Sequence, residues 1–431
     1  MTGHDVVVVG GGAAGLMAAC TAAARGRQVL LLEKMDQCGR KLRITGKGRC
    51  NLTNTASLRD TLPHIGSSSA GRGKGGDFLR NAYGRFFNHD LMQWFEDHGV
   101  PLTEERGGRV YPSSGKALDI FLALVNTLEQ SPNAVIRKNA TVKAIETLTV
   151  PSEDGGSATV ATGVVLQGGE RIGCRQIIMA TGGLSYPTTG STGAGLRMAA
   201  DLGHTVVEPI PSLVALKCTE KIPEELVGFQ LKNVQLALYN DIATTPIFQS
   251  GIGEMTFTYD GLAGPLTLSA SRVATRPLHE GRSLTAHLDL KPGLSPDQLD
   301  RRLLADIDAN GTRLFHDALR LWLPAEVIPL ALPQLHIEYY KRLHQLTSAE
   351  RHRLGTWLKG VPFTLSGTHD FNEAVVTQGG ISLAEVNPKT MESRRVRGLY
   401  LVGELLDLDA DTGGYNLQIA FSTGHAAGEA V

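Results

Sequence analysis

The chain has 431 residues, with 42 lysines and arginines against 43 aspartates and glutamates, which gives a formal net charge of -1 at pH 7. Hydrophobic residues make up 42% of it and charged residues 20%, proportions that are typical of a globular protein with two or three folding units. The balanced charge and the lack of a long basic run argue against nucleic acid or an anionic membrane as a partner. No apolar stretch is long enough to span a membrane.

Five cysteines occur, at positions 20, 38, 50, 174 and 218, and no pair has C-x-x-C or zinc-ligand spacing. The 13 histidines show no metal-ligand spacing either, so we expect no metal site. The first strand is predicted to begin at Asp5, which leaves no room for a signal peptide. We therefore expect a cytoplasmic protein with reduced cysteines. The sequence does not indicate its oligomeric state.

The most informative segment is at the N-terminus, where residues 5–33 are predicted to form a strand, a glycine turn, a helix, a second strand and an acid. Val6–Val9 is short and β-branched, which predicts a buried strand. Gly10, Gly12 and Gly15 then form G-x-G-x-x-G. In a dinucleotide-binding turn the first glycine permits the tight turn, the second lets the backbone approach a pyrophosphate, and the third lets the helix pack against the strand.

The residues after this turn complete the pattern of a dinucleotide-binding unit. Ala13–Arg25 is predicted to be a helix whose N-terminus faces the phosphates, and Gln28–Leu32 to be a second buried strand. Glu33 lies 18 residues after Gly15, where a carboxylate accepts hydrogen bonds from a ribose and would repel a 2′-phosphate. The same glycine pattern recurs at 71–76, but no strand precedes it, so we interpret that copy as a polar loop.

Regular segments alternate with glycine-rich ones along the rest of the chain. Met35–Gly76 is predicted to be mostly loop. Hydrophobic periodicity predicts helices at Asp77–His98, Lys116–Leu128, Ser295–Ala309, Thr312–Leu323, Leu335–Leu346, Ser348–Lys359 and Tyr415–Glu429. Strands are predicted at Val160–Leu166, Gln176–Ala180, Val206–Pro211, Leu213–Cys218, Val234–Tyr239, Glu254–Tyr259, Leu284–Leu290 and Gly398–Val402.

These elements predict an α/β chain in three parts. Residues 1–204 and 367–431 are expected to form one discontinuous nucleotide-binding domain. Residues 205–366 are expected to be an inserted unit that begins with strands and contains a helical subdomain at about 291–360.

Three features favour FAD over NAD as the bound dinucleotide. Only one glycine motif has the full strand and helix context, whereas a protein that binds both dinucleotides stably often has two. Gly39–Asn54, GRKLRITGKGRCNLTN, is rich in glycine, cations and asparagine, which suits a pyrophosphate and a ribityl chain. A helix that starts after Gly413-Gly414 could stabilise the negative charge of a reduced flavin. A solvated basic loop and a merely flexible turn are the alternative interpretations of the last two features.

The chain resembles the HI0933-type flavoprotein family, also called the BaiN-like NAD(P)/FAD-dependent oxidoreductases. The resemblance spans nearly the whole chain. The matching segments, in family order, are VVVVGGGAAGLMAA, GRKLRITGKGRCNLTN, RVYPSSGKA, ATGGLSYPTTGSTGAG, GEMTFTYDGLAGP, TQGGI and GLYLVGELLDLDADTGGYNLQIAFSTGHAAG.

This resemblance implies a Rossmann-like FAD-binding domain with an inserted β-barrel-like unit and a helical cap. It implies FAD contacts at Gly10, Gly12, Ala14, Gly15, Glu33, Arg40, Lys41, Asn51, Val142, Thr181, Gly182, Gly403, Glu404, Asn416, Leu417 and Gln418. We also expect Ala13, Lys34, Arg49 and Cys50, which lie within or beside these motifs, to belong to the cofactor site.

The family resemblance also implies a reaction. Parts of the chain resemble the flavin domains of fumarate reductases and 3-ketosteroid dehydrogenases, and family members are assigned reduction of conjugated C=C bonds in 3-oxo bile-acid-type substrates. We therefore expect a small, steroid-like substrate and transient docking of NAD(P)H as the electron donor. Tyr186, just after the Thr181-Gly182-Gly183 turn, is a candidate proton donor, although it could equally be packed under the loop.

Three other interpretations stay open at the level of sequence. Relatives with this domain arrangement include oxidases of amines or amino-ketones, which would release peroxide. A flavin-bound redox sensor without turnover would use the inserted unit as a partner surface. A tRNA-modifying flavoenzyme would need a basic RNA-binding face, against which the balanced charge argues.

Overall fold

The computed structural model describes residues 4–69, 75–151, 156–240 and 245–431. Contacts within the chain divide it into two compact units. Met1–Pro211 and Ala374–Val431 together form the first unit, and Ser212–Glu373 forms the second. The first unit is thus built from both ends of the chain. Its boundaries lie a few residues beyond those expected from the sequence, at 204 and 366.

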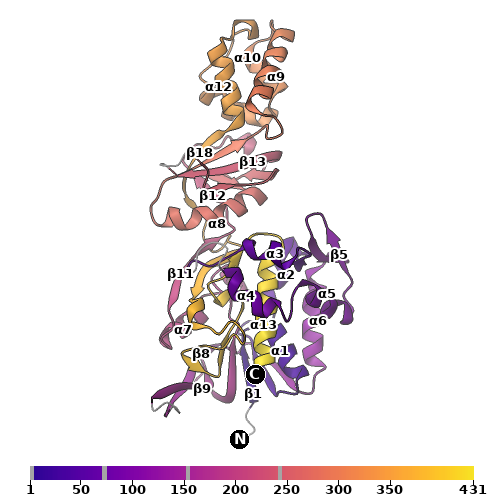
Figure 1. The fold of residues 1–431 in the computed structure, drawn as a ribbon, viewed down its shortest axis with the longest axis vertical. Coiled ribbons are helices and arrows are strands. Elements are labelled where there is room, and N and C mark those ends of the chain that lie inside the picture. The colour runs from indigo at the N-terminus through magenta and orange to yellow at the C-terminus, as the bar shows by residue number, and fades with distance from the viewer. Residues whose placement is uncertain (1–3, 70–74, 152–155, 241–244) are drawn as a thin grey trace. The chain divides into compact units, whose positions relative to one another are not determined.

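The first unit is organised around one large sheet (Figure 1). Its middle strands pair in parallel and are largely buried. The sheet comprises β1 (His4–Val9), β2 (Val29–Leu32), β7 (Ala134–Arg137), β8 (Val142–Pro151), β9 (Ser157–Leu166), β10 (Arg171–Met179), β20 (Val396–Arg397) and β21 (Leu399–Leu401). β1 pairs in parallel with β2 and β10, and β10 pairs in parallel with β21. The C-terminal segment therefore completes the sheet begun by the N-terminal one.

Helices and short strands surround this sheet. The helices are α1 (Ala13–Ala24), α2 (Arg40–Ile44), α3 (Leu58–Thr61), α4 (Gly75–Tyr83), α5 (Asn88–Asp97), α6 (Ala117–Glu129), α7 (Ala194–Asp201) and α13 (Tyr415–Ala430). The short strands are β3 (Thr53–Asn54), β4 (Ile65–Gly66), β5 (Leu102–Glu105), β6 (Arg109–Pro112), β11 (Val206–Ser212), β19 (Val376–Ile381) and β22 (Asp409–Ala410).

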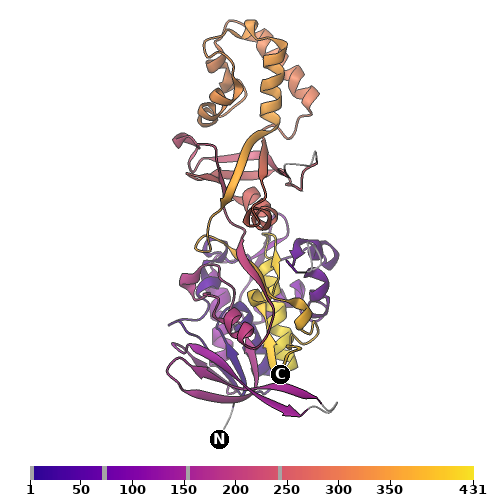
Figure 2. The same ribbon diagram turned by 90° about the vertical axis from the view of Figure 1, so that its left-hand side faces the viewer.

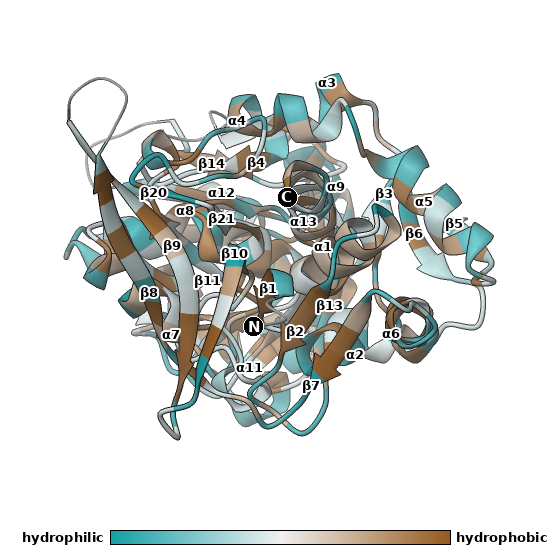
Figure 3. Cartoon of the chain, turned by 90° about the horizontal axis from the view of Figure 1, so that it is seen from below, coloured by the Kyte–Doolittle hydropathy of each residue, from teal (hydrophilic) through white to brown (hydrophobic). Residues whose placement is uncertain are grey.

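α1 and α13 lie against each other (Figure 3). A Cβ atom on Gly424 would lie 2.3 Å from the carbonyl oxygen of Ala14, and one on Gly428 would lie 2.6 Å from that of Ala18. A move of four residues toward the C-terminus on α13 thus corresponds to a move of four residues toward the C-terminus on α1, so the two helices run in the same direction. Tyr415, the first residue of α13, precedes Gly424 by nine residues, which is about 14 Å at a rise of about 1.5 Å per residue. The start of α13 thus lies well beyond the start of α1.

Two expectations for the region after β2 are wrong. The segment predicted to be loop, Met35–Gly76, contains α2, α3 and short strands. The helix predicted at Asp77–His98 is two helices, α4 and α5, because the Asp90 carboxylate accepts a hydrogen bond from the backbone N–H of Phe87 at 2.8 Å and so caps a new helix.

The second glycine pattern falls mostly outside the described residues, which omit 70–74. Its last two residues, Gly75 and Gly76, are described and begin α4. A Cβ on Gly75 would lie 2.5 Å from the carbonyl oxygen of Gly66, so this glycine permits close packing of two segments.

The second unit contains a closed antiparallel barrel, which Figures 1 and 2 show from directions 90° apart. Its strands are β12 (Leu216–Cys218), β13 (Gln230–Asn240), β14 (Phe248–Gln249), β15 (Gly253–Phe257), β16 (Gly261–Ala263), β17 (Leu284–Asp289) and β18 (Val361–Thr368). Because β13 pairs with both β15 and β17, the row of strands closes on itself. α8 (Pro265–His279) packs against several of these strands and was not predicted.

The helical part of the second unit contains α9 (Pro296–Ala309), α10 (Phe315–Ala318), α11 (Ile328–Leu335) and α12 (Ser348–Lys359). The helix predicted at Leu335–Leu346 is wrong. α11 ends where this prediction begins, because His336 adopts a left-handed conformation with φ +49°. In the described part of the chain, no helix is long and apolar enough to cross a bilayer.

Candidate functional site

The glycine turn after β1 leaves an open helix N-terminus. Gly10 has φ +107°, and a Cβ there would lie 2.5 Å from the carbonyl oxygen of Ala180. A Cβ on Gly15 would lie 1.9 Å from the carbonyl oxygen of Gly10, so both glycines are sterically required. Gly12, the N-cap of α1, has no atom within 4 Å of its Cβ position and provides no side-chain cap. The first N–H groups of a helix lack intrahelical acceptors, so this terminus suits a phosphate.

Glu33 fixes the loop beside this terminus. The residue is only 9% exposed, and its carboxylate accepts hydrogen bonds from the backbone N–H groups of Gly11 and Met35, each at 2.8 Å. A carboxylate has further lone pairs, so Glu33 can also accept from a ribose hydroxyl. The adjacent Lys34 donates to the Thr192 hydroxyl at 2.9 Å, and partial burial lowers the pKa of this lysine.

A charged network joins four segments at the carboxyl ends of the parallel strands. The Lys41 ammonium lies 2.7 Å from the Glu404 carboxylate and 2.8 Å from the Ser185 hydroxyl. Ser185 donates to Glu404, and the backbone N–H of Thr377 donates to the same carboxylate at 2.9 Å. Burial alone would raise the pKa of Glu404, but Lys41 and these donors outweigh it and lower the pKa. Glu404 therefore stays ionised with its side chain only 21% exposed.

This network lies beside both parallel helices. A Cβ on Gly403 would lie 2.9 Å from the Cβ of Ala14 in α1, and the N–H of Gly403 donates to the Thr423 hydroxyl of α13 at 3.0 Å. Two of its members, Ser185 and Thr377, were not named as site residues. Both lie inside segments of the family resemblance, ATGGLSYP and TQGGI, which is the signal that could have found them.

The start of α13 is held by the loop that carries the cationic motif. The Asn51 side-chain amide is oriented so that its oxygen and its nitrogen both have partners. The oxygen accepts from the N–H of Gly414 at 3.0 Å, and the nitrogen donates to the carbonyl of Thr53 at 3.1 Å. Asn416 binds the preceding strand β22. Its side-chain amide accepts from the backbone N–H of Ala410 and donates to the carbonyl of the same residue. Gln418 is buried and bonded to Thr53 and Ser422. Leu417 lies between Asn416 and Gln418 in the sequence and is partly buried.

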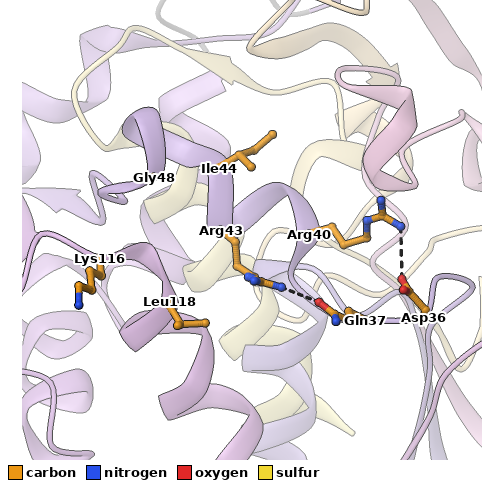
Figure 4. A pocket seen from close by; sticks show the side chains of 8 residues that line it. All are labelled: Asp36, Gln37, Arg40, Arg43, Ile44, Gly48, Lys116 and Leu118. Atoms are coloured by element: carbon orange, nitrogen blue, oxygen red, sulfur yellow. Dashed lines mark hydrogen bonds and ion pairs between the residues drawn. The ribbon is translucent and has the colours of Figure 1, made fainter.

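Several other expected site residues contact groups of the protein itself, and their contacts with FAD stay predictions. Arg40, next to Lys41 on α2, lines a separate pocket of about 520 Å³ and lies 3.3 Å from Asp36. The pocket lining is shown in Figure 4 and consists of Asp36, Gln37, Arg40, Arg43, Ile44, Gly48, Lys116 and Leu118. Arg40 and Lys41, although adjacent on α2, therefore have different partners within the protein.

Arg49 and Cys50 are likewise engaged with the protein. The Arg49 guanidinium pairs with Glu105 at 2.5 Å and lies 4.3 Å from the ring centre of Tyr111. Cys50 is fully buried with φ +60°, and burial raises the pKa of its thiol to about 12. A thiol in this state is a packing group rather than a reactive thiolate. All five cysteines are free.

The remaining expected residues follow strand ends. Thr181 and Gly182 follow β10, and the buried Thr181 hydroxyl has no hydrogen-bond partner among the described residues. Val142 begins β8 and is buried. Tyr186 adopts a left-handed conformation with φ +50° and is partly buried directly after Ser185. Its role as proton donor stays a prediction.

The sequence profile of the HI0933-like protein Rossmann domain matches residues 4–430. The chain belongs to the HI0933-like family. This membership confirms the family and the Rossmann-like fold predicted from the sequence, and makes the chain an FAD-dependent oxidoreductase. Over the ranges that the structure covers, no group of three or more His, Cys, Asp or Glu side chains could hold a metal ion.

Two curated relatives of this HI0933-like chain align over almost their full lengths. The 3-dehydro-bile acid delta(4,6)-reductase of Clostridium scindens is 31% identical over 99% of this chain and 98% of its own. The ribosomal RNA dihydrouridine synthase of Escherichia coli is 28% identical over 100% of this chain and 98% of its own. Among solved structures, 3-ketosteroid delta1-dehydrogenase from Sterolibacterium denitrificans has a TM-score of 0.51 at 14% identity, covering 100% of this chain and 99% of that one, and shares the fold.

The residues present fit an extended FAD. The open space over Gly12 suits a pyrophosphate. In the loop after β10, beside Gly10, the Thr181 hydroxyl has no hydrogen-bond partner among the described residues and could bind the cofactor. The second helix terminus, at Tyr415, lies about 14 Å further along the common helix direction. That offset is of the order of a ribityl chain and part of a flavin ring, whereas a mononucleotide would not need a second terminus at this place.

Proposed function

We propose that this HI0933-like protein uses FAD to reduce a C=C bond conjugated to a carbonyl in a small, steroid-like substrate. NAD(P)H is the proposed electron donor and docks transiently. The observation that supports this most is the full-length relationship at 31% identity to a 3-dehydro-bile acid delta(4,6)-reductase. The name of the second relative, a dihydrouridine synthase, also describes saturation of a C=C bond conjugated to a carbonyl.

Particular residues would hold the cofactor. The α1 terminus at Gly12 and Ala13 would bind the pyrophosphate, and Glu33 would bind the adenosine ribose. Lys41 and Glu404 would face the ribityl hydroxyls, since their segments lie beside the first turn of α1. The start of α13 would lie at the pyrimidine edge of the ring. When bound, FAD supplies the two-electron transfer to the substrate carbon. The chain itself supplies binding, orientation and a proton.

The test uses the purified protein loaded with FAD under anaerobic conditions. Mixing with NADH or NADPH in a stopped-flow instrument should bleach the flavin absorbance. Subsequent mixing with 1,4-androstadiene-3,17-dione should restore it, and mass spectrometry should detect a product heavier by two hydrogens. Bleaching by neither nucleotide would remove NAD(P)H as the donor. Dithionite-reduced protein that no conjugated enone reoxidises would remove the proposed reaction.

A uracil base in ribosomal RNA is a second candidate substrate, because the E. coli relative is 28% identical along the whole chain. The net charge of -1 weighs against it. Deleting the gene and digesting the ribosomal RNA to nucleosides separates the two substrates. Loss of dihydrouridine from the deletion strain, restored by the intact gene, would favour the RNA substrate over the steroid-like one.

An amine or amino-ketone oxidase on the same scaffold would use oxygen, rather than a conjugated C=C bond, as the electron acceptor. It would reduce its flavin with the amine and release peroxide in air without any nicotinamide nucleotide. A peroxide assay with a panel of small amines separates this activity from the proposed reductase. A flavin sensor without turnover would respond to neither assay, although its flavin would still change colour on reduction.

A further inference from the structure

Three side chains from distant segments meet beside the start of α13. His64 ends the short helical turn η2 (Leu62–His64), Asp411 follows β22, and Tyr415 is the first residue of α13. The His64 Nδ1 atom lies 2.8 Å from the Asp411 carboxylate. The His64 ring stacks on the Tyr415 ring, with 4.7 Å between centres and 11° between planes.

The backbone holds this histidine and its carboxylate in register. The N–H of Asp411 donates to the carbonyl of His64 at 3.1 Å, and the adjoining strands β4 and β22 pair through Ile65 and Ala410. The Asn416 amide fixes Ala410 from the other side. The imidazole is therefore oriented before any ligand arrives, which is the arrangement of a base held by a carboxylate.

The pair is accessible on the side that Asp411 does not occupy. The His64 side chain is 42% exposed and the Asp411 side chain is 22% exposed. Because Nδ1 faces Asp411, Nε2 is the ring nitrogen left for another partner. A histidine whose only task was to link β4 to β22 would not need this orientation, because the backbone hydrogen bonds already make that link.

The position of the pair relates it to the proposed flavin. Gly413 and Gly414 lie between Asp411 and Tyr415, and the start of α13 is where the pyrimidine edge of the ring is proposed to lie. Asn54 donates to the carbonyl of Gly413 at 3.1 Å, so the cationic motif also ends at this point. The His64 pair thus lies at the ring end of the site, whereas Lys41 and Glu404 lie beside the first turn of α1.

We infer that His64, oriented by Asp411, is the proton donor to the substrate in the proposed reduction. The inference rests on the proposed function. The Nε2–H bond breaks and a C–H bond forms at the carbon next to the carbonyl, while the hydride from reduced FAD forms the C–H bond at the other carbon of the double bond. NAD(P)H or another two-electron donor reduces the flavin, and solvent returns the proton to His64.

Charged groups from several elements face the stacked pair of His64 and Tyr415. Asp411 is in direct contact. Tyr415 lies flat against the ring, and burial raises the pKa of this tyrosine, which Asp411 and Asp60 raise further and Arg109 lowers. Tyr415 therefore remains a neutral stacking surface at ordinary pH.

The test separates the two half-reactions of the FAD-loaded protein. In the His64→Gln variant, the FAD content and the rate of flavin bleaching by dithionite should stay within about twofold of wild type. Reoxidation by 1,4-androstadiene-3,17-dione should slow about 100-fold, the usual contribution of a positioned acid. In wild type this rate should fall with rising pH, and the pH-dependent limb should vanish in the variant. His98→Gln is the matched control, since His98 is an exposed histidine stacked on Trp94 at 3.9 Å.

A binding measurement provides a readout that needs no turnover. A phenolate imitates the enolate oxygen and perturbs the spectrum of oxidised flavin when it stacks on it, so 4-chlorophenol is the probe. His64→Gln should weaken its binding about tenfold and alter its pH dependence, and Asp411→Asn should do so less strongly.

The outcomes distinguish the inference from the proposed function. An FAD-loaded His64→Gln variant that is reoxidised at the wild-type rate overturns the role of His64, whatever the phenol does. Wild-type protein that no enone reoxidises overturns the proposed reaction itself. If His64→Gln does not retain FAD, Asp411→Asn decides the matter, because this variant keeps the imidazole and should still slow reoxidation at least about threefold.

Discussion

The two helix N-termini of the first unit, at α1 and at α13, both begin after glycine but have opposite surroundings. Gly12 before α1 has φ -83° and empty space at its Cβ position. Gly414 before α13 has φ +99°, and a Cβ there would lie 2.3 Å from the carbonyl oxygen of Thr53. The glycine of α1 thus leaves room for a ligand, whereas the glycine of α13 lets one protein segment pack against another.

This difference shows that glycine content alone does not indicate a phosphate site. Both helices have free N–H groups in their first turn, and neither has a side-chain cap. At α13, however, the Asn51 amide already accepts from the N–H of Gly414. The α1 terminus therefore has room for a charged ligand, whereas part of the α13 terminus is already occupied by the Asn51 amide.

The largest effect is expected from Gly15→Ala, which tests whether the α1 terminus is held by the turn. The new Cβ would lie 1.9 Å from the carbonyl oxygen of Gly10, so α1 must move away from β1. We expect a loss of at least about 3 kcal/mol in the free energy of unfolding, together with loss of FAD. Urea unfolding and the flavin absorbance of the purified protein measure the two effects.

Gly26→Ala is the matched control for this substitution. Gly26 lies just past the other end of α1, and no atom lies within 4 Å of its Cβ position, although its φ is +81°. It should cost only the left-handed conformation, about 1 kcal/mol, and should leave FAD bound. Equal losses in both variants would contradict the requirement for close packing at Gly15.

The next effect concerns the ion pair beside the first turn of α1. Lys41→Met leaves the Glu404 carboxylate buried without its cation, which should cost about 2 kcal/mol at neutral pH. The pKa of Glu404 is low in the folded wild type, so its contribution is present above the unfolded pKa and is lost as the pH falls. The difference in stability between variant and wild type should therefore shrink in acid.

Arg137→Met provides the comparison for an exposed ion pair. Arg137 lies 2.6 Å from Glu170, at nearly the same distance as Lys41 from Glu404, but both of its partners are open to solvent. This variant should be almost as stable as wild type at every pH. If Lys41→Met were equally harmless, or if its cost persisted unchanged into acid, the Glu404 network would not depend on the lysine.

The sequence predicted the two ends of the site but not the connection between them. The turn at Gly10–Gly15 and the helix after Gly414 were found because local patterns specify them: a β-branched strand, fixed glycine spacing and a long helical period. The networks at Glu404 and at His64 join residues hundreds of positions apart. No local pattern encodes such contacts, so only the fold shows that Lys41 meets Glu404 while Arg40 does not.

The errors in the predicted elements have similar causes. α8 has a mixed face, with Pro277 inside it and buried polar residues such as Ser271 and Thr275, so its helical pattern is weak. The segment after Leu335 has helical spacing of apolar residues, yet His336 adopts a left-handed conformation that ends α11. In each case tertiary packing overrode the local preference. The closure of the barrel through β13 and β17 likewise depends on pairing that the sequence does not show.

Only a small change in stability is expected from Gly12→Ala, and its comparison with Gly414→Ala tests the contrast between the two termini directly. At Gly414 an alanine would combine a left-handed conformation with a 2.3 Å approach to the carbonyl of Thr53, which should cost about 2 kcal/mol. At Gly12 the same methyl group meets no protein atom, so the apoprotein should unfold within about 0.5 kcal/mol of wild type. The methyl would instead occupy the space of the pyrophosphate, and the FAD dissociation constant should rise about tenfold, or about 1.4 kcal/mol. Calorimetric titration of the apoprotein with FAD, paired with urea unfolding, measures both quantities. A Gly12→Ala variant that binds FAD as tightly as wild type would mean that the open space over α1 is not where the phosphates lie.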